Sequence, residues 1–165
     1  MRKLPSKLGD PTEEKSPAVA AEPTVRQPSE KPGVLVVDDE HIVRIMVQLG
    51  LERNGFDVWL ARSGQEAIDL YRRHQKEITV VLLDVRMSGL DGLQTLEILR
   101  ELNPEVPTCL MNGDTGPGKP EELLQHGAAY VIAKPFLLDD LANILRLMAQ
   151  GVPADLVPSG RVWQG

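Results

Sequence analysis

The sequence predicts an α/β fold in which helices cover both faces of a doubly wound parallel sheet. Short apolar runs alternate with longer amphipathic stretches from residue 33 to residue 150, and this alternation is typical of βα units. The runs at 34–37 and 79–83 contain almost no polar residue, as expected for parallel strands buried on both faces. Five such units follow one another, which predicts one domain.

The first two units occupy residues 34–74. Strands are predicted at 34–37 and at 57–60. The apolar residues that indicate the first helix recur at helical spacing and are Ile42, Ile45, Met46 and Leu49. Gly55 is expected to end this helix. The second helix is indicated by the stripe Ala67, Leu70, Tyr71 and His74.

The other three units occupy residues 79–148, with strands predicted at 79–83, 108–111 and 130–133. The third helix carries Leu93, Leu96, Leu99 and Leu102 and is expected to stop at Asn103, because a proline follows. A glycine-rich loop at 113–118 leads to a short helix at 121–126. The last helix is indicated by Leu141, Ile144, Leu145 and Met148.

Composition divides the chain into three segments. Residues 1–32 contain six prolines and no aromatic residue, which predicts a disordered arm. Residues 33–150 are expected to form the domain, and residues 151–165, rich in glycine and proline, a C-terminal tail.

The overall charge narrows the range of partners. A net charge of −6 and a pI of about 5.1 leave no basic surface for nucleic acid or anionic lipid. The single Cys109 cannot form an internal disulfide, and no apolar run approaches the length that spans a bilayer. The expectation is a cytoplasmic protein that binds neither nucleic acid nor membrane.

Polar residues follow four of the predicted strands. They are Asp38 and Asp39 after the first strand, Asp84 after the third, Asn112 after the fourth and Lys134 after the fifth. In an open parallel sheet these ends meet at one edge, where ligands bind. Converging carboxylates repel one another unless a hard cation joins them, and Mg²⁺ prefers such sparse oxygen sites. An added lysine holds a phosphoryl oxygen, so the pattern predicts phosphoryl transfer.

Three segments of the sequence, 34–40, 82–92 and 133–136, resemble in order and spacing the signature segments of the receiver domains of bacterial two-component response regulators. The resemblance covers roughly residues 33 to 150. It implies a flavodoxin-like sheet of strand order 2-1-3-4-5. It also implies a phosphoacceptor module that signals by changing shape. Its partner would be a sensor histidine kinase or a phosphotransfer protein, and its only catalysis would be on itself.

The resemblance also assigns roles to single residues. Asp84 would be the phosphoacceptor, Asp38 and Asp39 would hold Mg²⁺ together with Asp84, Arg86 would give a backbone carbonyl to the metal, and Lys134 would bind the phosphoryl group. The peptide bond between Lys134 and Pro135 is often cis in this family.

Two positions depart from the family pattern. Asn112 stands where a Ser or Thr hydroxyl is usual, and Val131 where an aromatic residue is usual. Tyr130 precedes Val131 by one residue, so it should point to the opposite face of the sheet. These departures affect the expected coupling between the phosphoryl group and the last strands.

Two alternatives remain open from the sequence. A receiver fold that binds partners without phosphorylation is compatible with Asn112 and Val131. A Mg²⁺-dependent phosphatase of the haloacid-dehalogenase kind also uses an aspartate nucleophile, but it places that aspartate after the first strand in an Asp-x-Asp segment. Phosphate transfer from a small phosphodonor would separate these functions.

Overall fold

The computed structural model describes residues 30–114 and 116–159. These residues contain a five-stranded parallel sheet of order β2-β1-β3-β4-β5, which confirms the predicted fold class and strand order. The elements are β1 (Gly33–Val37), α1 (His41–Arg53), β2 (Asp57–Ala61), α2 (Gly64–His74), β3 (Ile78–Asp84), α3 (Gly92–Leu102), β4 (Thr108–Asn112), α4 (Pro120–Gln125), β5 (Tyr130–Ala133), α5 (Leu138–Ala149) and a 3₁₀ turn, η1 (Ala154–Leu156). Most of the expected arm, residues 1–29, and the last six residues lie outside the described part of the chain.

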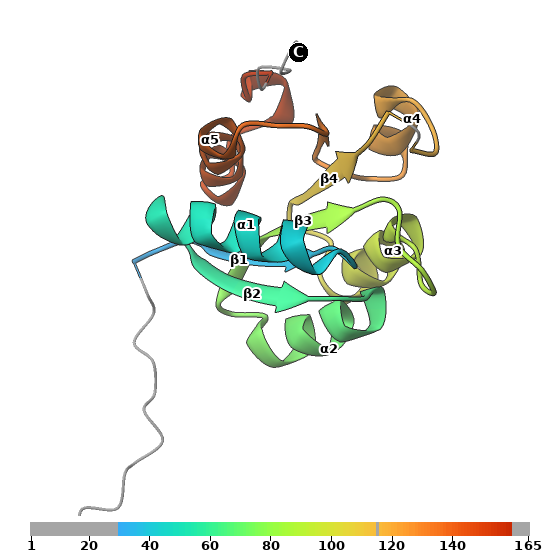
Figure 1. Ribbon diagram of the computed structural model, residues 1–165, viewed down its shortest axis with the longest axis horizontal. Helices are drawn as coiled ribbons and strands as arrows, with labels where there is room; N and C mark the ends of the chain where they lie inside the picture. Colours follow the sequence, from blue (N-terminus) through green and yellow to red (C-terminus); the bar gives the residue numbers. More distant parts are fainter. Residues whose placement is uncertain (1–29, 115, 160–165) are drawn as a thin grey trace, which may run out of the picture.

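Helices cover both faces of the sheet (Figure 1). Helices α1 and α5 pack on one face, while α2, α3 and α4 pack on the other. Alternate residues of β1 serve the two faces: Val34 and Val36 belong to the core beneath α1 and α5, whereas Leu35 and Val37 belong to the opposite core. This arrangement explains why the strand has no polar alternation.

Helix α1 buries a different side from the one its apolar spacing suggested. Ile42, Met46 and Leu49 are exposed, at 72%, 57% and 56% of their surface. The buried residues are Val47, Gly50 and Leu51. A Cβ atom at Gly50 would crowd the side chain of Leu138 in α5, so this glycine lets the two helices approach closely. The helix was predicted correctly, but it carries apolar residues on two sides.

The segment after α5 contacts the core. Val157 is buried among residues of the α1 and α5 face, and the Tyr130 hydroxyl donates to the Pro158 carbonyl oxygen at 3.0 Å. Composition did not predict these contacts for the expected tail, and the domain boundary at residue 150 stays a prediction. No helix in the described ranges is long and apolar enough to cross a membrane.

Candidate functional site

Strand register brings the predicted site residues together. Val37 pairs with Leu83, so the next residues along, Asp38 and Asp84, are neighbours at the carboxyl ends of β1 and β3. Asn112, the last residue of β4, pairs with Ala133, the last residue of β5. Lys134 therefore follows directly at the carboxyl ends of these two strands. The edge of the sheet expected from the sequence is therefore the edge where these side chains meet.

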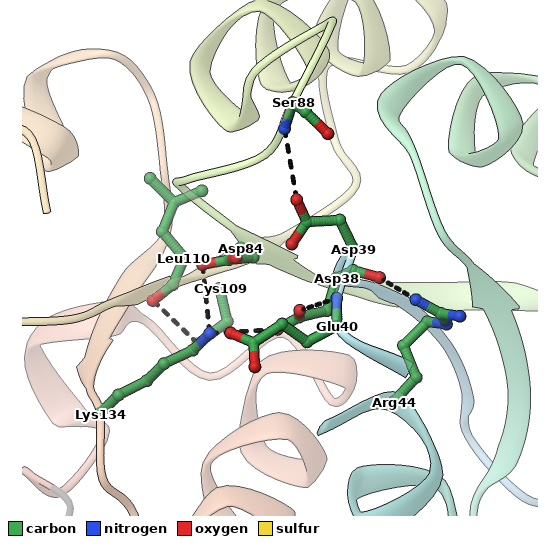
Figure 2. Close-up of polar contacts among 9 residues, drawn as sticks. All are labelled: Asp38, Asp39, Glu40, Arg44, Asp84, Ser88, Cys109, Leu110 and Lys134. Atoms are coloured by element: carbon green, nitrogen blue, oxygen red, sulfur yellow. Dashed lines mark hydrogen bonds and ion pairs between the residues drawn. The ribbon is translucent and has the colours of Figure 1, made fainter. Parts of the chain in front are cut away.

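Three carboxylates form the acidic part of the site. Oxygen atoms of Asp38, Asp39 and Asp84 lie within 4.8 Å of one another. Asp38 is fully buried and Asp84 is 5% exposed, whereas Asp39 faces solvent. Figure 2 shows Asp39 reaching toward Ser88, whose backbone N–H donates to Asp39 Oδ2 at 3.3 Å.

Lys134 supplies the positive charge beside these carboxylates. Its Nζ lies 3.1 Å from Asp38 Oδ2 and 3.3 Å from Asp84 Oδ1 (Figure 2). The Lys134 backbone N–H donates to the Asn112 carbonyl oxygen at 2.8 Å, and the peptide bond to Pro135 is cis, as the resemblance implied. The lysine side chain thus bridges the ends of β1 and β3 from the loop after β5.

Burial and charge shift two pKa values in this site. Burial raises the pKa of the Asp84 carboxyl, and the negative charge of Asp38 adds to this, although Lys134 opposes it. Burial by itself lowers the pKa of Lys134, but the charges of Asp38 and Asp84 more than offset that effect, so the Lys134 pKa is raised. The lysine is therefore charged at neutral pH.

The loop after Asp84 is held close to the strand. Gly92, the first residue of α3, packs so tightly that a Cβ atom there would collide with the Asp84 carbonyl oxygen. Asp91 caps α3 by accepting from the Gln94 N–H at 2.8 Å. A backbone hydrogen bond from Arg86 reaches the Asp84 carboxyl. Asp84 therefore ends β3, and the first residue of α3 packs directly against its backbone.

Asn112 faces the loop between β4 and α4. Its Nδ2 donates to the Gly118 carbonyl oxygen at a long 3.4 Å, and its Oδ1 is buried with no hydrogen-bond partner among the residues that the structure describes. A Cβ atom at Gly116 would collide with that oxygen. Asn112 thus lies at the edge of the site, as predicted, but its side-chain amide donates to the loop and not to the acidic residues.

The two residues at the start of β5 point to opposite faces, as predicted. Tyr130 packs against the α1 and α5 core, whereas Val131 packs against the core beneath α2, α3 and α4.

Sequence reasoning missed two contacts that shape the acidic segment. One is the Ser88 amide described above, and the other is the Arg44 guanidinium, which donates to the Asp38 carbonyl oxygen at 2.6 Å. Both involve backbone groups, which leave no mark on the residue pattern.

The donor set fits a hard divalent cation. All three convergent side chains offer carboxylate oxygens, and the Lys134 ammonium group contacts two of them. Mg²⁺ favours carboxylate oxygens and commonly shares its shell with a phosphoryl oxygen. The arrangement can therefore hold such a cation and a phosphoryl group against Asp84, with Lys134 as the second positive contact.

Sequence comparison gives a family for this pattern. The sequence model of the response regulator receiver domain matches residues 34–146. Response regulator MprA of Mycobacterium sp. (strain KMS) is 33% identical over 125 residues, which is 76% of this chain and 54% of that protein. Transcriptional regulatory protein ZraR of Escherichia coli (strain K12) is 35% identical over 112 residues, or 68% of this chain and 25% of that protein. The chain thus spans about half the length of MprA and about a quarter of the length of ZraR.

Solved structures show the same similarity. The receiver domain of the Francisella response regulator 1452 is 29% identical with a TM-score of 0.66, and the match covers 73% of this chain and 98% of that one. The Vibrio cholerae chemotaxis protein CheY4 is 28% identical with a TM-score of 0.66, covering 72% of this chain and 98% of that one. Both matches extend over nearly the whole of the solved chain.

Proposed function

The chain belongs to the response regulator receiver domain family, whose members act in two-component systems, and from this premise we propose that Asp84 accepts a phosphoryl group with the help of Mg²⁺. The observation that carries the proposal is the contact set of Asp84. Its carboxylate lies 3.3 Å from Lys134 Nζ and within 4.8 Å of oxygens of Asp38 and Asp39. A nucleophile, a cation for phosphoryl oxygens and a carboxylate set for a metal therefore share one point of the sheet edge.

Asp38, Asp39 and Asp84 would hold the metal through carboxylate oxygens, and Arg86 would add its backbone carbonyl. Bound Mg²⁺ would neutralise charge on the phosphoryl oxygens. Lys134 would contact another phosphoryl oxygen as a compact cation. Because Lys134 contacts Asp84 before any phosphoryl group arrives, little rearrangement of the lysine is needed.

The covalent step is an exchange of one bond to phosphorus for another. An Asp84 carboxylate oxygen bonds to phosphorus while the bond between phosphorus and the donor nitrogen breaks, and that nitrogen leaves with the electron pair. Later attack by water breaks the bond to Asp84 and releases inorganic phosphate. The chain acts in both steps on its own aspartate rather than on a separate substrate.

A phosphohistidine protein, either a sensor histidine kinase or a phosphotransfer protein, is the proposed donor. It must cover the surface next to Asp84 to deliver its phosphoryl group. An open apolar groove of about 450 Å³ lies there, lined by Val43, Met46, Phe136 and Leu138 together with Lys134. The exposed Ile42, Met46 and Leu49 of α1 extend the apolar surface away from the groove. We assign this surface, the α1 groove and stripe, to the donor.

The output of the signal is a change of shape that a downstream protein reads. ZraR carries the name of a transcriptional regulatory protein and is longer than this chain, so the expected lack of nucleic-acid binding is a prediction for these 165 residues. The acidic net charge of −6 supports it.

Incubation with acetyl phosphate and Mg²⁺ tests the function directly. Mass spectrometry should show one added phosphoryl group on the wild-type chain, labile to hydroxylamine as an acyl phosphate is. The Asp84→Asn variant should remain unmodified, and Asp57→Asn, at the amino end of β2, should be modified like the wild type. Labelling of Asp84→Asn at the wild-type level would contradict the assignment, and an unlabelled wild type would favour a receiver that works without phosphorylation.

A further inference from the structure

Arg44 lies behind the acidic segment and holds it from the side opposite to the site. Its Nη1 donates to the Asp38 carbonyl oxygen at 2.6 Å, and its Nη2 lies 3.4 Å from His41 Nδ1. Figure 2 shows the guanidinium approaching Asp38 from α1, whereas Lys134 approaches from the far side. The arginine therefore reaches the backbone of the acidic segment and not the carboxylates.

Helix stability does not explain this arginine. Arg44 lies in the first turn of α1, where a positive charge opposes the helix dipole. The first turn contains no acidic residue, and the N-cap residue Glu40 makes no capping hydrogen bond through its side chain. Among the described residues, the shortest contact of the guanidinium is with the carbonyl of Asp38, the residue that follows β1.

The carbonyl that Arg44 binds controls where Asp39 points. The peptide between Asp38 and Asp39 is planar, so fixing its oxygen also fixes the direction in which the chain continues to the Asp39 Cα. Asp38 itself is held through its N–H by the Ala61 carbonyl at 3.2 Å and through Oδ1 by the Glu40 N–H at 2.9 Å. Asp39 is exposed, and its carboxylate accepts a hydrogen bond from the Ser88 N–H at 3.3 Å. The backbone contact of Arg44 thus adds to the long hydrogen bond by which Ser88 holds the Asp39 side chain.

From this geometry we propose that Arg44 is a positioning residue for Mg²⁺ and phosphoryl transfer, because it fixes the Asp38–Asp39 peptide in the orientation that aims the Asp39 carboxylate at Asp84. The inference rests on the proposed function of Asp84 and deepens it. Outer contacts of this kind orient metal ligands, and their loss typically weakens metal binding about tenfold or more.

A matched arginine makes the test specific. Arg146 in α5 also donates to a backbone carbonyl at 2.6 Å, that of Asn54, at the other end of α1. Arg44→Met should weaken Mg²⁺ binding about tenfold by calorimetry. It should also slow phosphorylation by acetyl phosphate at limiting Mg²⁺, with the rate recovering at saturating Mg²⁺. Arg44→Lys should be intermediate, since it keeps the charge with a single donor group. Arg146→Met should lower the melting temperature without changing Mg²⁺ affinity.

Equal Mg²⁺ affinity in Arg44→Met and the wild type would overturn the inference, as would equal weakening in Arg44→Met and Arg146→Met. If Arg44→Met does not fold, the same comparison is made between Arg44→Lys and Arg146→Lys. Failure of the proposed function looks different, because the wild type itself would then neither bind Mg²⁺ at this site nor accept a phosphoryl group on Asp84.

Discussion

Lys134 Nζ lies 3.1 Å from Asp38 Oδ2, a carboxylate that is fully buried. The same ammonium group lies 3.3 Å from Asp84 Oδ1, so one cation compensates two buried negative charges. The raised pKa of Lys134 means that the folded chain holds this proton more tightly than the unfolded chain does. Its stabilising effect is therefore complete at neutral pH and is lost only as the pH rises through the raised pKa, above about 10.4.

Replacing Lys134 with Met should leave Asp38 and Asp84 without a cation. Removing one partner of a largely buried ion pair strands the other charge, and we expect a loss of about 2 kcal/mol or more in the free energy of unfolding without Mg²⁺. Added Mg²⁺ should stabilise Lys134→Met more than the wild type, because the metal no longer competes with the ammonium group. Urea denaturation with and without Mg²⁺ measures both effects. The exposed Lys76→Met is the control, and an equal loss in the two variants would contradict the role of Lys134.

The position of Lys134 was predictable because it depends on topology. Residues that follow parallel strands meet at one edge, and the predicted strands were right to within one or two residues at Asp38, Asp84 and Lys134. The strand order itself came from the family resemblance rather than from the apolar pattern. The pattern reports which runs are buried, but it does not report which run lies beside which.

The side of α1 that is buried was not predictable from spacing. Its apolar residues occur on two sides of the helix, and packing against α5 at Gly50 decides which side faces inward. Contacts made through backbone atoms, such as those of Arg44 and Ser88, depend on coordinates that residue types do not encode. The hydrogen bond from the Asn112 amide to the Gly118 carbonyl oxygen was not predictable for the same reason, because its acceptor is a backbone atom.

The pKa of Asp84 predicts how stability without metal varies with pH. Burial raises this pKa, so the folded chain binds the proton more readily than the unfolded chain does. The wild type should therefore lose stability as the pH rises from the ordinary aspartate pKa, about 3.9, through the raised value. Asp84→Asn carries no charge there, so it should lack this loss and melt at a higher temperature than the wild type at neutral pH.

Thermal unfolding in a chelating buffer, from about pH 4 to about pH 7, measures the difference between wild type and Asp84→Asn. The gap in melting temperature should widen as the pH rises. Asp57→Asn serves as the control because Asp57 lies at the amino ends of the strands, away from the carboxyl ends that hold the site. A gap that narrows toward neutral pH would mean that Lys134 outweighs burial at Asp84.

If the donor protein binds the α1 groove and stripe, mutations on this surface should slow phosphoryl transfer from the protein donor but not from a small phosphodonor. An Asp at position 46 or 49 places a charge in the apolar contact, and loss of a central contact costs roughly 2 kcal/mol of binding free energy. Met46→Asp and Leu49→Asp should thus slow transfer from the cognate phosphohistidine protein at least about tenfold. Both residues are exposed, so the fold should survive.

Transfer from acetyl phosphate should remain at the wild-type rate in both variants, because a small donor does not need the α1 groove and stripe. Glu101→Lys, on the exposed side of α3, provides a charge-changing control elsewhere on the surface. If Met46→Asp and Leu49→Asp accept phosphoryl groups from the protein donor at the wild-type rate, the donor binds another surface.

The last prediction is that phosphorylation moves the loop after Asn112 more than it moves Val131. The Asn112 amide gives up little when it turns, because its bond to the Gly118 carbonyl is long, at 3.4 Å, and its Oδ1 has no partner within residues 30–114 and 116–159. A hydrogen bond from this amide to a charged phosphoryl oxygen is worth roughly 1.5–3 kcal/mol, enough to shift a two-state loop. Gly113 and Gly116 lack Cβ atoms that would restrict the backbone there. Val131 has no long side chain to exchange between buried and exposed positions.

Beryllofluoride with Mg²⁺ should therefore produce its largest remote amide shifts over residues 112–119. Gly116→Ala, which crowds Asn112 Oδ1, should alter those shifts while leaving Val131 unchanged. Strong shifts confined to Tyr130 and Val131, with residues 113–118 unmoved, would show that the signal leaves through β5 instead.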